Sequence, residues 1–314
     1  MLKRFVTGFA VATTALALAS TASAGYPDRP VTFVVPFGAG GGTDGVARAF
    51  QAEFAKALGG TIVVKNTAGA SGTVGAAEAA NAKADGYTLG FLPIGPATIQ
   101  PHLRKLPYSL DSWDFVCNVT ASPVTLMTQK SATVNSVADM VKAIKDGGKN
   151  IYGSSGPGTI PHLAMAATAS NLGLKMKHLP HKGTANAMKS MAGGVIQYFA
   201  DTPVVLSRFD VKALATFTAE RIPALKDVPT MKELGYDMQF SVWRGIFAPK
   251  GTPADAVAKL AAACETAAAS DGFKAFAKKT NTDILYMDSK AFAAFAQSEF
   301  KKNGEILKAA GLKK

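Results

Sequence analysis

Cysteine and histidine are scarce in this chain, which has 2 cysteines and 4 histidines among 314 residues. Neither Cys117 nor Cys264 lies in a CxxC motif, and the histidines do not show the H-E-x-x-H spacing of zinc enzymes. We therefore expect no metal and no cofactor. The two cysteines could pair in an oxidising compartment, but their separation in the sequence neither favours nor excludes a disulfide.

Runs of one charge are also absent, although the chain carries 34 Lys and Arg against 22 Asp and Glu. The basic residues are dispersed, and arginines do not alternate with aromatic residues as they do in nucleic-acid patches. We expect no nucleic-acid partner. The positive charge favours solubility and would also help to collect anionic small molecules.

A membrane-spanning run is missing as well. Phe5–Ala19 is apolar but is interrupted by threonines and falls short of the ~20 residues that a spanning helix needs. Lys3 and Arg4 precede this run, and Ala22-Ser23-Ala24 follows it, as in a secretory signal peptide. We predict that residues 1–24 are cleaved before Gly25 and that the mature protein is periplasmic. No cysteine follows the run, so a lipid anchor is not supported.

The most informative stretch present is Val31–Val46, VTFVVPFGAGGGTDGV. Its β-branched start predicts a buried strand, its glycines predict a loop that a ligand can approach closely, and Thr43-Asp44 predicts a helix N-terminus. Strand, glycine loop and helix N-terminus together make a cradle of backbone N–H groups that suits an anion.

A second stretch repeats this order in the middle of the chain. Ile151-Tyr152 predicts a strand, Gly153–Thr159 (GSSGPGT) a polar loop, and Ile160–Asn171 a helix. Two such cradles indicate one in each of two domains, facing each other across a cleft.

Strands alternate with helices along most of the chain, which predicts an α/β fold with parallel sheets. Val46, Phe50, Phe54 and Leu58 recur every four residues and mark the buried face of the first helix. Further strands are expected at 61–65, 87–92, 115–119, 124–128, 175–179, 195–200, 211–216 and 241–248, and further helices at 75–84, 134–144, 184–192, 230–234, 253–269 and 290–309. Gly95–Thr98 is expected to be a loop.

Two enzyme hypotheses can be examined in the same residues. Gly40, Gly42 and Gly45 fit G-x-G-x-x-G, but the second strand ends at Lys65-Asn66 without the acidic residue of a dinucleotide site. An exported serine hydrolase would use Ser154 or Ser155 with His162, although Pro157 replaces the last glycine of a nucleophile elbow. This hydrolase is the alternative to a binding protein. His162 is either a packing residue or a ligand donor, and Asp201 either faces a cleft or caps a helix.

The motifs together resemble those of the Bug (TctC) family, the substrate-binding proteins of tripartite tricarboxylate transporters. The stretches that carry the resemblance are Tyr26–Arg48, Asn66–Gly75, Asp85–Leu89, Tyr152–Ala164, His181–Thr184, Arg221–Leu225, Val228–Met231 and Phe247–Pro253. They follow one another in order over essentially the whole mature chain.

The resemblance implies a non-enzymatic, monomeric periplasmic binding protein of type II-like fold, with two domains that each hold a mainly parallel sheet flanked by helices. The domains would comprise residues 25–122 plus 245–314 and residues 123–244, and would close on a ligand in the cleft between them. The ligand would be a small di- or tricarboxylate or aromatic acid, passed on to membrane transporter subunits.

The resemblance also implies where the ligand lies. Its carboxylate would be held between the two glycine loops by backbone N–H groups and ordered waters, without an arginine. The expected ligand-binding residues are Phe37, Gly38, Ala39, Gly41, Gly42, Thr43, Gly95, Pro96, Ala97, Ser154, Ser155, Gly158, Thr159, His162, Asp201, Thr202 and Pro203. The chain departs from the family at Tyr198 and Phe199, whose bulk either alters the cleft or fills the core.

Overall fold

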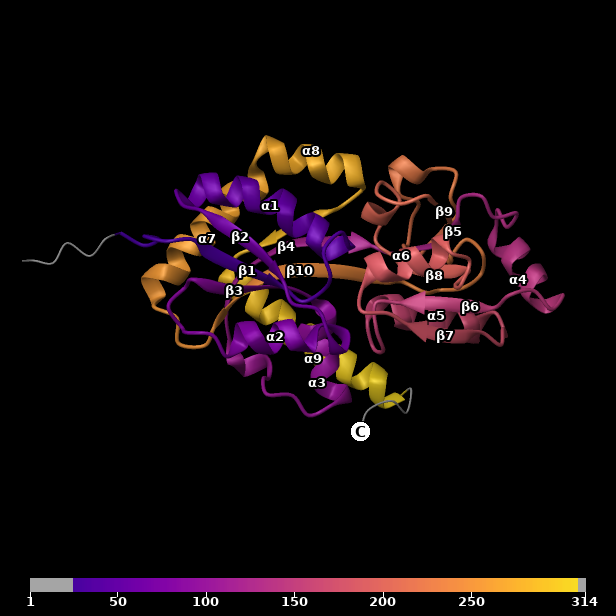
Figure 1. Ribbon diagram of the computed structural model, residues 1–314, viewed down its shortest axis with the longest axis horizontal. Coiled ribbons are helices and arrows are strands. Elements are labelled where there is room, and N and C mark those ends of the chain that lie inside the picture. The colour runs from indigo at the N-terminus through magenta and orange to yellow at the C-terminus, as the bar shows by residue number, and fades with distance from the viewer. Residues whose placement is uncertain (1–24, 310–314) are drawn as a thin grey trace, which may run out of the picture.

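The structure is a computed structural model that describes residues 25–309, arranged as two lobes with one central sheet each (Figure 1). The predicted signal peptide, residues 1–24, lies outside the described residues. In the first lobe the sheet order is β11-β4-β10-β3-β1-β2, and in the second it is β7-β6-β8-β5-β9. The first sheet contains β1 (Val31–Val35), β2 (Ile62–Asn66), β3 (Thr88–Pro93), β4 (Trp113–Pro123), β10 (Ser241–Pro249) and β11 (Ile284–Met287), and the second contains β5 (Thr125–Gln129), β6 (Ile151–Ser154), β7 (Lys177–Pro180), β8 (Tyr198–Asp201) and β9 (Val211–Thr216).

Helices cover both faces of the first sheet. On one face the predicted stripe Val46, Phe50, Phe54 and Leu58 is buried against the sheet and against neighbouring helices. On the other face, alanines of one helix and Phe292 of the last helix form a separate core. The helices of this lobe are α1 (Gly42–Leu58), α2 (Thr73–Ala80), α3 (Gln100–Leu103), α7 (Ala254–Ala269), α8 (Asp271–Thr280) and α9 (Ser289–Ala309); those of the second lobe are α4 (Val137–Lys145), α5 (Ile160–Asn171) and α6 (Thr184–Ala192).

The two-lobed α/β fold is confirmed, but its sheets are mixed rather than mainly parallel. The pairs β1–β2, β1–β3, β6–β7 and β6–β8 are parallel, as expected for strands joined through helices. β10 lies antiparallel to both β3 and β4, and β5 lies antiparallel to β8 and β9. The reason is that β4 carries the chain out of the first lobe and β10 brings it back, so these strands run in opposite directions.

The two connecting strands meet at the junction of the lobes. β4 and β10 pair from Ser241 opposite Pro123 to Pro249 opposite Trp113, so Ser241–Arg244 belong to the sheet of the first lobe. Just beyond this pairing, the N–H of Val124 donates to the carbonyl of Phe240 at 3.2 Å, and Phe240 and Val124 are each bonded to Phe217. The chain therefore passes between the lobes in two short segments, at Pro123-Val124 and Phe240-Ser241, which are hydrogen-bonded to each other.

Four local predictions differ from the structure. Gly95–Ile99 forms one turn of π-helix that leads directly into α3, where a loop was expected. Thr230–Leu234 is a series of turns rather than a helix, with Thr230 bridged to Thr216. Helix α8 and strand β11 were not predicted.

The two cysteines form a disulfide. Cys117 of β4 is bonded to Cys264 of α7, with a Cα–Cα distance of 6.6 Å and a sequence separation of 147. Both are fully buried, so the bond fixes a connecting strand to a helix inside the core of the first lobe.

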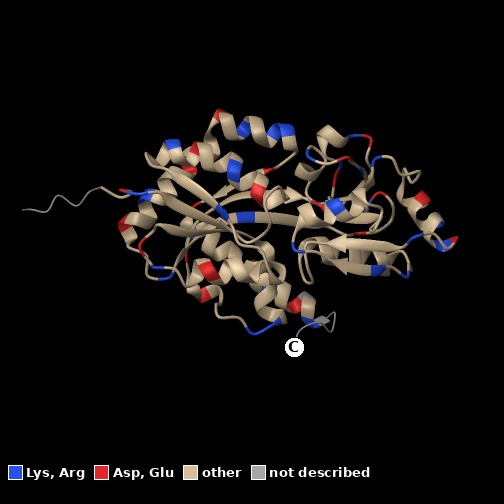
Figure 2. Cartoon of the chain, viewed as in Figure 1, with Lys and Arg blue, Asp and Glu red and all other residues tan. Residues whose placement is uncertain are grey.

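Lys and Arg are interspersed with Asp and Glu over both lobes (Figure 2). Within residues 25–309, no helix is both long and apolar enough to cross a membrane.

Candidate ligand-binding site

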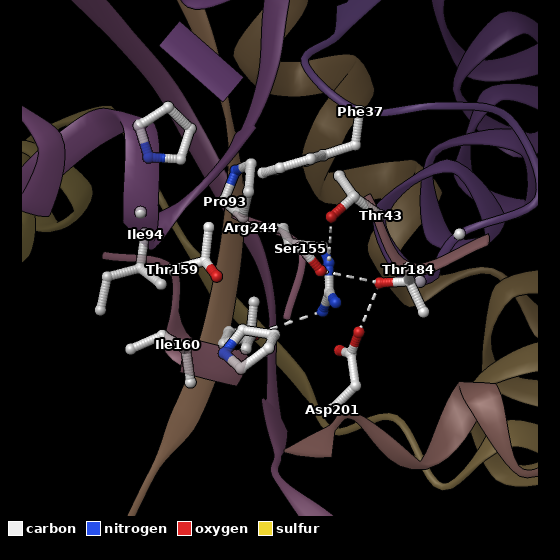
Figure 3. Close-up of a pocket in the computed structure, with 16 residues that line it drawn as sticks. Phe37, Thr43, Pro93, Ile94, Ser155, Thr159, Ile160, Thr184, Asp201 and Arg244 are labelled. Atoms are coloured by element: carbon white, nitrogen blue, oxygen red, sulfur yellow. Dashed lines mark hydrogen bonds between the residues drawn. The ribbon is translucent and has the colours of Figure 1, made fainter. Parts of the chain in front are cut away.

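A pocket lies between the lobes, with about 450 Å³ of space not filled by protein atoms, part of it open to solvent (Figure 3). Both lobes and the connecting strand β10 contribute to it. Its lining residues are Phe37, Gly41, Gly42, Thr43, Pro93, Ile94, Gly95 and Pro96 from the first lobe, Ser155, Thr159, Ile160, Pro161, Thr184 and Asp201 from the second, and Val242 and Arg244 from β10.

The loop after β1 presents the first glycine cradle. Helix α1 begins at Gly42 with Gly41 as its N-cap, one residue before the predicted helix N-terminus at Thr43-Asp44, and no side chain caps it by a hydrogen bond. Two side chains that do not line the cavity hold the shape of the loop. Asp44 Oδ2 accepts from the N–H of Gly40 at 2.8 Å, and Asn66 donates to the carbonyl of Phe37 at 3.0 Å. Burial opposes ionisation of Asp44, but hydrogen bonds from Gly40, Asn66 and Arg48 hold its pKa below the usual value. The helix N-terminus therefore keeps backbone donors for a ligand.

The loop after β6 presents the second cradle. Thr159 caps helix α5, and its hydroxyl donates to the carbonyl of Gly156 at 2.7 Å. Gly156 and Gly158 adopt positive φ values of 126° and 72°, which glycine tolerates best. The Ser155 hydroxyl lies 3.1 Å from the hydroxyl of Thr184 at the start of α6.

Three predicted residues shape this second loop from behind and do not line the cavity. Ser154 is fully buried; its Oγ accepts from the N–H of Gly156 at 3.1 Å and lies 2.7 Å from His178 Nε2. The N–H of Gly158 donates to His162 Nδ1 at 3.1 Å. Of the alternatives left open for His162, the structure therefore shows a role in supporting the loop.

Asp201 ends β8 and points into the cavity rather than capping a helix (Figure 3). Its Oδ2 accepts from the Thr184 hydroxyl at 2.5 Å, and its Oδ1 accepts from the N–H of Thr202 at 2.7 Å. The side chain is buried, and this burial raises the pKa of Asp201 despite these hydrogen bonds and the charge of Arg244.

Arg244 is the one charged residue among the lining residues that the site prediction missed. Its side chain is only 1% exposed, and its guanidinium lies between the side chains of Thr43, Thr184 and Asp201 (Figure 3). It donates to Thr43 Oγ1 at 3.4 Å, to Ser122 Oγ at 3.2 Å, to the carbonyl of Val242 at 3.3 Å and to Thr202 Oγ1 at 3.4 Å.

All four of these acceptors are neutral. Among the described residues, no carboxylate oxygen lies within 4.0 Å of the Arg244 guanidinium. Burial lowers the pKa of Arg244 to about 10, and the charge of Asp201 acts in the opposite direction. The arginine therefore remains charged at neutral pH, with an incomplete set of partners.

The structure thus places nine of the predicted residues on the cavity wall: Phe37, Gly41, Gly42, Thr43, Gly95, Pro96, Ser155, Thr159 and Asp201. The others that were predicted, Gly38, Ala39, Ala97, Ser154, Gly158, His162, Thr202 and Pro203, lie outside the wall. The lining residues that the site prediction missed are Pro93, Ile94, Ile160, Pro161, Thr184, Val242 and Arg244. Tyr198 and Phe199 are buried in the hydrophobic cores and do not line the cavity.

The geometry does not provide the serine–histidine pair of the hydrolase alternative. Ser155 bonds to Thr184, Ser154 bonds to His178, and His162 accepts from a backbone N–H. Ser154 is also fully buried, so a substrate could not reach its hydroxyl. In the part of the chain that the structure describes, no group of three or more His, Cys, Asp or Glu residues could hold a metal ion.

Comparisons with known proteins agree with this architecture. Residues 46–312 match the tripartite tricarboxylate transporter family receptor, TctC. A UPF0065 protein of Bordetella pertussis is 30% identical over 313 residues, covering 96% of each chain. The structure of the periplasmic binding protein BugD superposes with a TM-score of 0.86 at 32% identity, covering 92% of this chain and 99% of BugD.

A second solved structure was determined with a ligand. MatC from Rhodopseudomonas palustris, described with bound malate, superposes with a TM-score of 0.83 at 30% identity, covering 90% of this chain and all of MatC (100%). The matched length, the identity and the shared two-lobed fold lead to the same assignment. This chain belongs to the TctC family of tripartite tricarboxylate transporter receptors, which have the fold of periplasmic binding proteins.

Proposed function

We propose that this protein is a periplasmic receptor that captures a small organic carboxylate between its lobes and passes it to the membrane subunits of a tripartite tricarboxylate-type transporter. The ligand is a di- or tricarboxylate or an aromatic acid. The receptor acts as a monomer without catalysis, in the periplasm after removal of residues 1–24.

The observation that carries this proposal is the buried charge of Arg244. A buried cation without an anionic partner is costly, whereas a carboxylate that accepts two parallel N–H bonds from a guanidinium is a favoured partner. Four of the hydrogen bonds that the five N–H groups of an arginine can donate are made, all of them at 3.2–3.4 Å. A ligand carboxylate would supply the missing negative charge.

The cradles support the same ligand class. The N-termini of α1 and α5 border the cavity from opposite lobes, and both direct the positive ends of their helix dipoles toward it. An anion between them is stabilised from both sides. The malate bound in MatC is a carboxylate of this class.

Closure of the lobes is part of the proposal. We propose that residues 25–122 plus 245–314 and residues 123–244 move as two domains, except that Pro123 and Ser241–Arg244 move with the first domain because they pair in its sheet. The hinge then lies at the crossings Pro123-Val124 and Phe240-Ser241, where only short stretches of chain connect the domains. The Cys117–Cys264 disulfide supports export, because such bonds persist in oxidising compartments.

The test is a thermal-shift screen of Gly25–Lys314, unfolded and refolded first to remove any bound ligand. The panel contains malate, citrate, dicarboxylates of four to nine carbons, acidic amino acids, and benzoate- and terephthalate-like acids. A ligand that binds only the folded state stabilises it by RT ln(1 + [L]/Kd), which is about 2.7 kcal/mol at a hundredfold excess over Kd. The melting temperature should therefore rise with ligand concentration.

The matched controls are the amides of the same acids, which keep the shape and lose the charge. A shift for one group of acids and none for the amides is the expected result. If no carboxylate shifts the melting temperature, or if the amides act equally well, the proposed ligand class is wrong.

A further inference from the structure

Three oxygen atoms form a continuous hydrogen-bonded relay from the cavity wall to Asp201. Ser155 Oγ lies 3.1 Å from Thr184 Oγ1, and Thr184 Oγ1 lies 2.5 Å from Asp201 Oδ2. All three side chains line the cavity and all three are buried (Figure 3). The other carboxylate oxygen, Asp201 Oδ1, is already occupied by the N–H of Thr202 at 2.7 Å.

Each hydroxyl has a single hydrogen to donate, so the relay can be oriented in only two ways. When Asp201 is ionised, the Thr184 hydroxyl must donate to it, and the hydrogen between Ser155 and Thr184 must then come from Ser155. Ser155 is left with lone pairs only, and a ligand carboxylate would meet an acceptor.

When Asp201 is protonated, every bond in the relay reverses. The proton on Oδ2 is donated to Thr184, Thr184 donates to Ser155, and the Ser155 hydroxyl is free to donate to a ligand. A carboxylate in the cavity therefore fits the protonated state of Asp201, and a ligand hydroxyl or amine fits the ionised state.

Charge balance favours the same state. Of the elements around Asp201, β10 supplies Arg244, α6 supplies the neutral Thr184, and the neighbouring strand β5 supplies the neutral Thr125, which pairs with Asp201. Of these residues, Arg244 is the charged one, and its positive charge favours the ionised form of Asp201. A ligand carboxylate bound to Arg244 would leave two carboxylates sharing one guanidinium in a buried space, and such a pair retains a proton.

We propose that this receptor binds its carboxylate ligand together with one proton, which Asp201 takes from the solvent, so that Asp201 selects anionic ligands by reversing the Ser155–Thr184 relay. The inference rests on the proposed function and adds that ligand binding is coupled to protonation of Asp201. The raised pKa of Asp201 agrees with it, because burial already shifts this carboxyl toward its protonated form.

The experiment is isothermal titration calorimetry of Gly25–Lys314 with malate, and with the acid that gives the largest shift in the panel. Titrations in buffers of low and high ionisation enthalpy at the same pH give the number of protons bound with the ligand. We expect an uptake that approaches one proton per ligand as the pH is raised from about 6 to 8, and an affinity that falls by up to about tenfold per pH unit.

The variant Asp201→Asn assigns the proton. An asparagine amide is always neutral and can donate to Thr184 while its oxygen accepts from Thr202, so it imitates protonated Asp201. We expect the variant to bind carboxylates without proton uptake and with an affinity that no longer depends on pH. The exposed Asp227→Asn is the matched control and should behave like the wild type.

The outcomes separate this inference from the proposed function. Carboxylate binding by the wild type without proton uptake would overturn the inference and leave the receptor assignment intact. Uptake that persists in a folded Asp201→Asn protein would also overturn it, because the proton would then belong to another group. If no carboxylate binds at all, the proposed function itself fails.

Discussion

At the scale of single residues, Arg244 combines almost complete burial with hydrogen bonds to neutral oxygens only. An arginine that holds a fold together normally pairs with a carboxylate, and its removal is then destabilising. An arginine kept for a ligand destabilises the empty protein, because its burial costs desolvation energy that no carboxylate offsets. Its removal is then neutral or stabilising. The two roles therefore predict opposite effects on stability.

Replacing Arg244 with methionine should separate these effects. We expect Arg244→Met to leave the melting temperature without ligand unchanged or higher, and to weaken carboxylate binding by about 2–5 kcal/mol, as when one partner of a buried charge pair is lost. Thermal shift and calorimetry on the same preparation measure both. Arg29→Met, which removes an exposed arginine of the first lobe, is the control for net charge. A destabilised variant that still binds would assign Arg244 to the fold instead.

The residues of the site differ in how far the sequence could predict them. Gly41, Gly42, Ser155 and Asp201 lie at strand ends or helix starts, where local patterns already indicate a binding loop. Arg244 lies inside an apolar strand, and that lone charge was the available signal, because charged residues are rarely buried without a purpose. Its position beside Asp201 depends on β10 pairing with β3 and β4, which no local pattern specifies.

At the scale of elements, the loop after β6 depends on two neutral histidines. His162 Nδ1 accepts from the N–H of Gly158, so a proton on this nitrogen would remove a bond that shapes the loop, and His178 Nε2 is hydrogen-bonded to the Ser154 hydroxyl. The two rings stack with centroids 4.2 Å apart, so their positive charges would also repel. Burial lowers the pKa of His162, and burial together with the neighbouring histidines lowers the pKa of His178 from 6.5 to about 4.

This pattern predicts a loss of stability in mild acid. Between pH 6.5 and about 4 the unfolded chain binds more protons at His178 than the folded chain does, so the free energy of unfolding falls as the pH falls. Denaturant unfolding at several pH values in this window measures the slope. In His178→Gln the amide can still hydrogen-bond to the Ser154 hydroxyl but cannot take up a proton, and we expect a shallower slope. His102→Gln, in the first lobe, should keep the wild-type slope, and equal slopes for all three proteins would contradict the prediction.

Most elements were predictable because their hydrophobic periodicity, and the turn and capping residues that bound them, are local features of the sequence. The stripe of α1 and the strand–loop–helix order at β1 and β6 are examples. The antiparallel strands were not, because the direction of β10 follows from the return of the chain between lobes. The four-residue edge strand β11 depends on β4 for its pairing, and the Gly95-Pro96 pair, which usually marks a loop, starts a π-helix here because proline is tolerated in a first turn.

At the scale of the whole molecule, the Cys117–Cys264 disulfide closes a loop that contains the entire second lobe. Cross-linking so long a stretch restricts the unfolded chain strongly, and removal of a native disulfide commonly costs about 2–5 kcal/mol. The cavity does not include either cysteine. Stability and binding should therefore respond differently to its loss.

We expect the double variant Cys117→Ala/Cys264→Ala to unfold at a lower temperature than the oxidised wild type and to bind the ligand with similar affinity. Wild type treated with a reductant under unfolding conditions should match the variant in stability. Thermal unfolding with and without a saturating carboxylate measures both effects. Equal melting temperatures for the oxidised and cysteine-free proteins would show that the bond does not contribute to stability.

The membership of Arg244 in β10 has a further consequence under the proposed closure. The positive charge stays with the sheet of the first lobe, whereas Ser155, Thr184 and Asp201 travel with the second. A ligand that contacts both Arg244 and these second-lobe residues holds the lobes together, so its binding changes the shape of the molecule. A membrane partner can then distinguish a loaded receptor from an empty one by touching both lobes at once, without ever contacting the cargo.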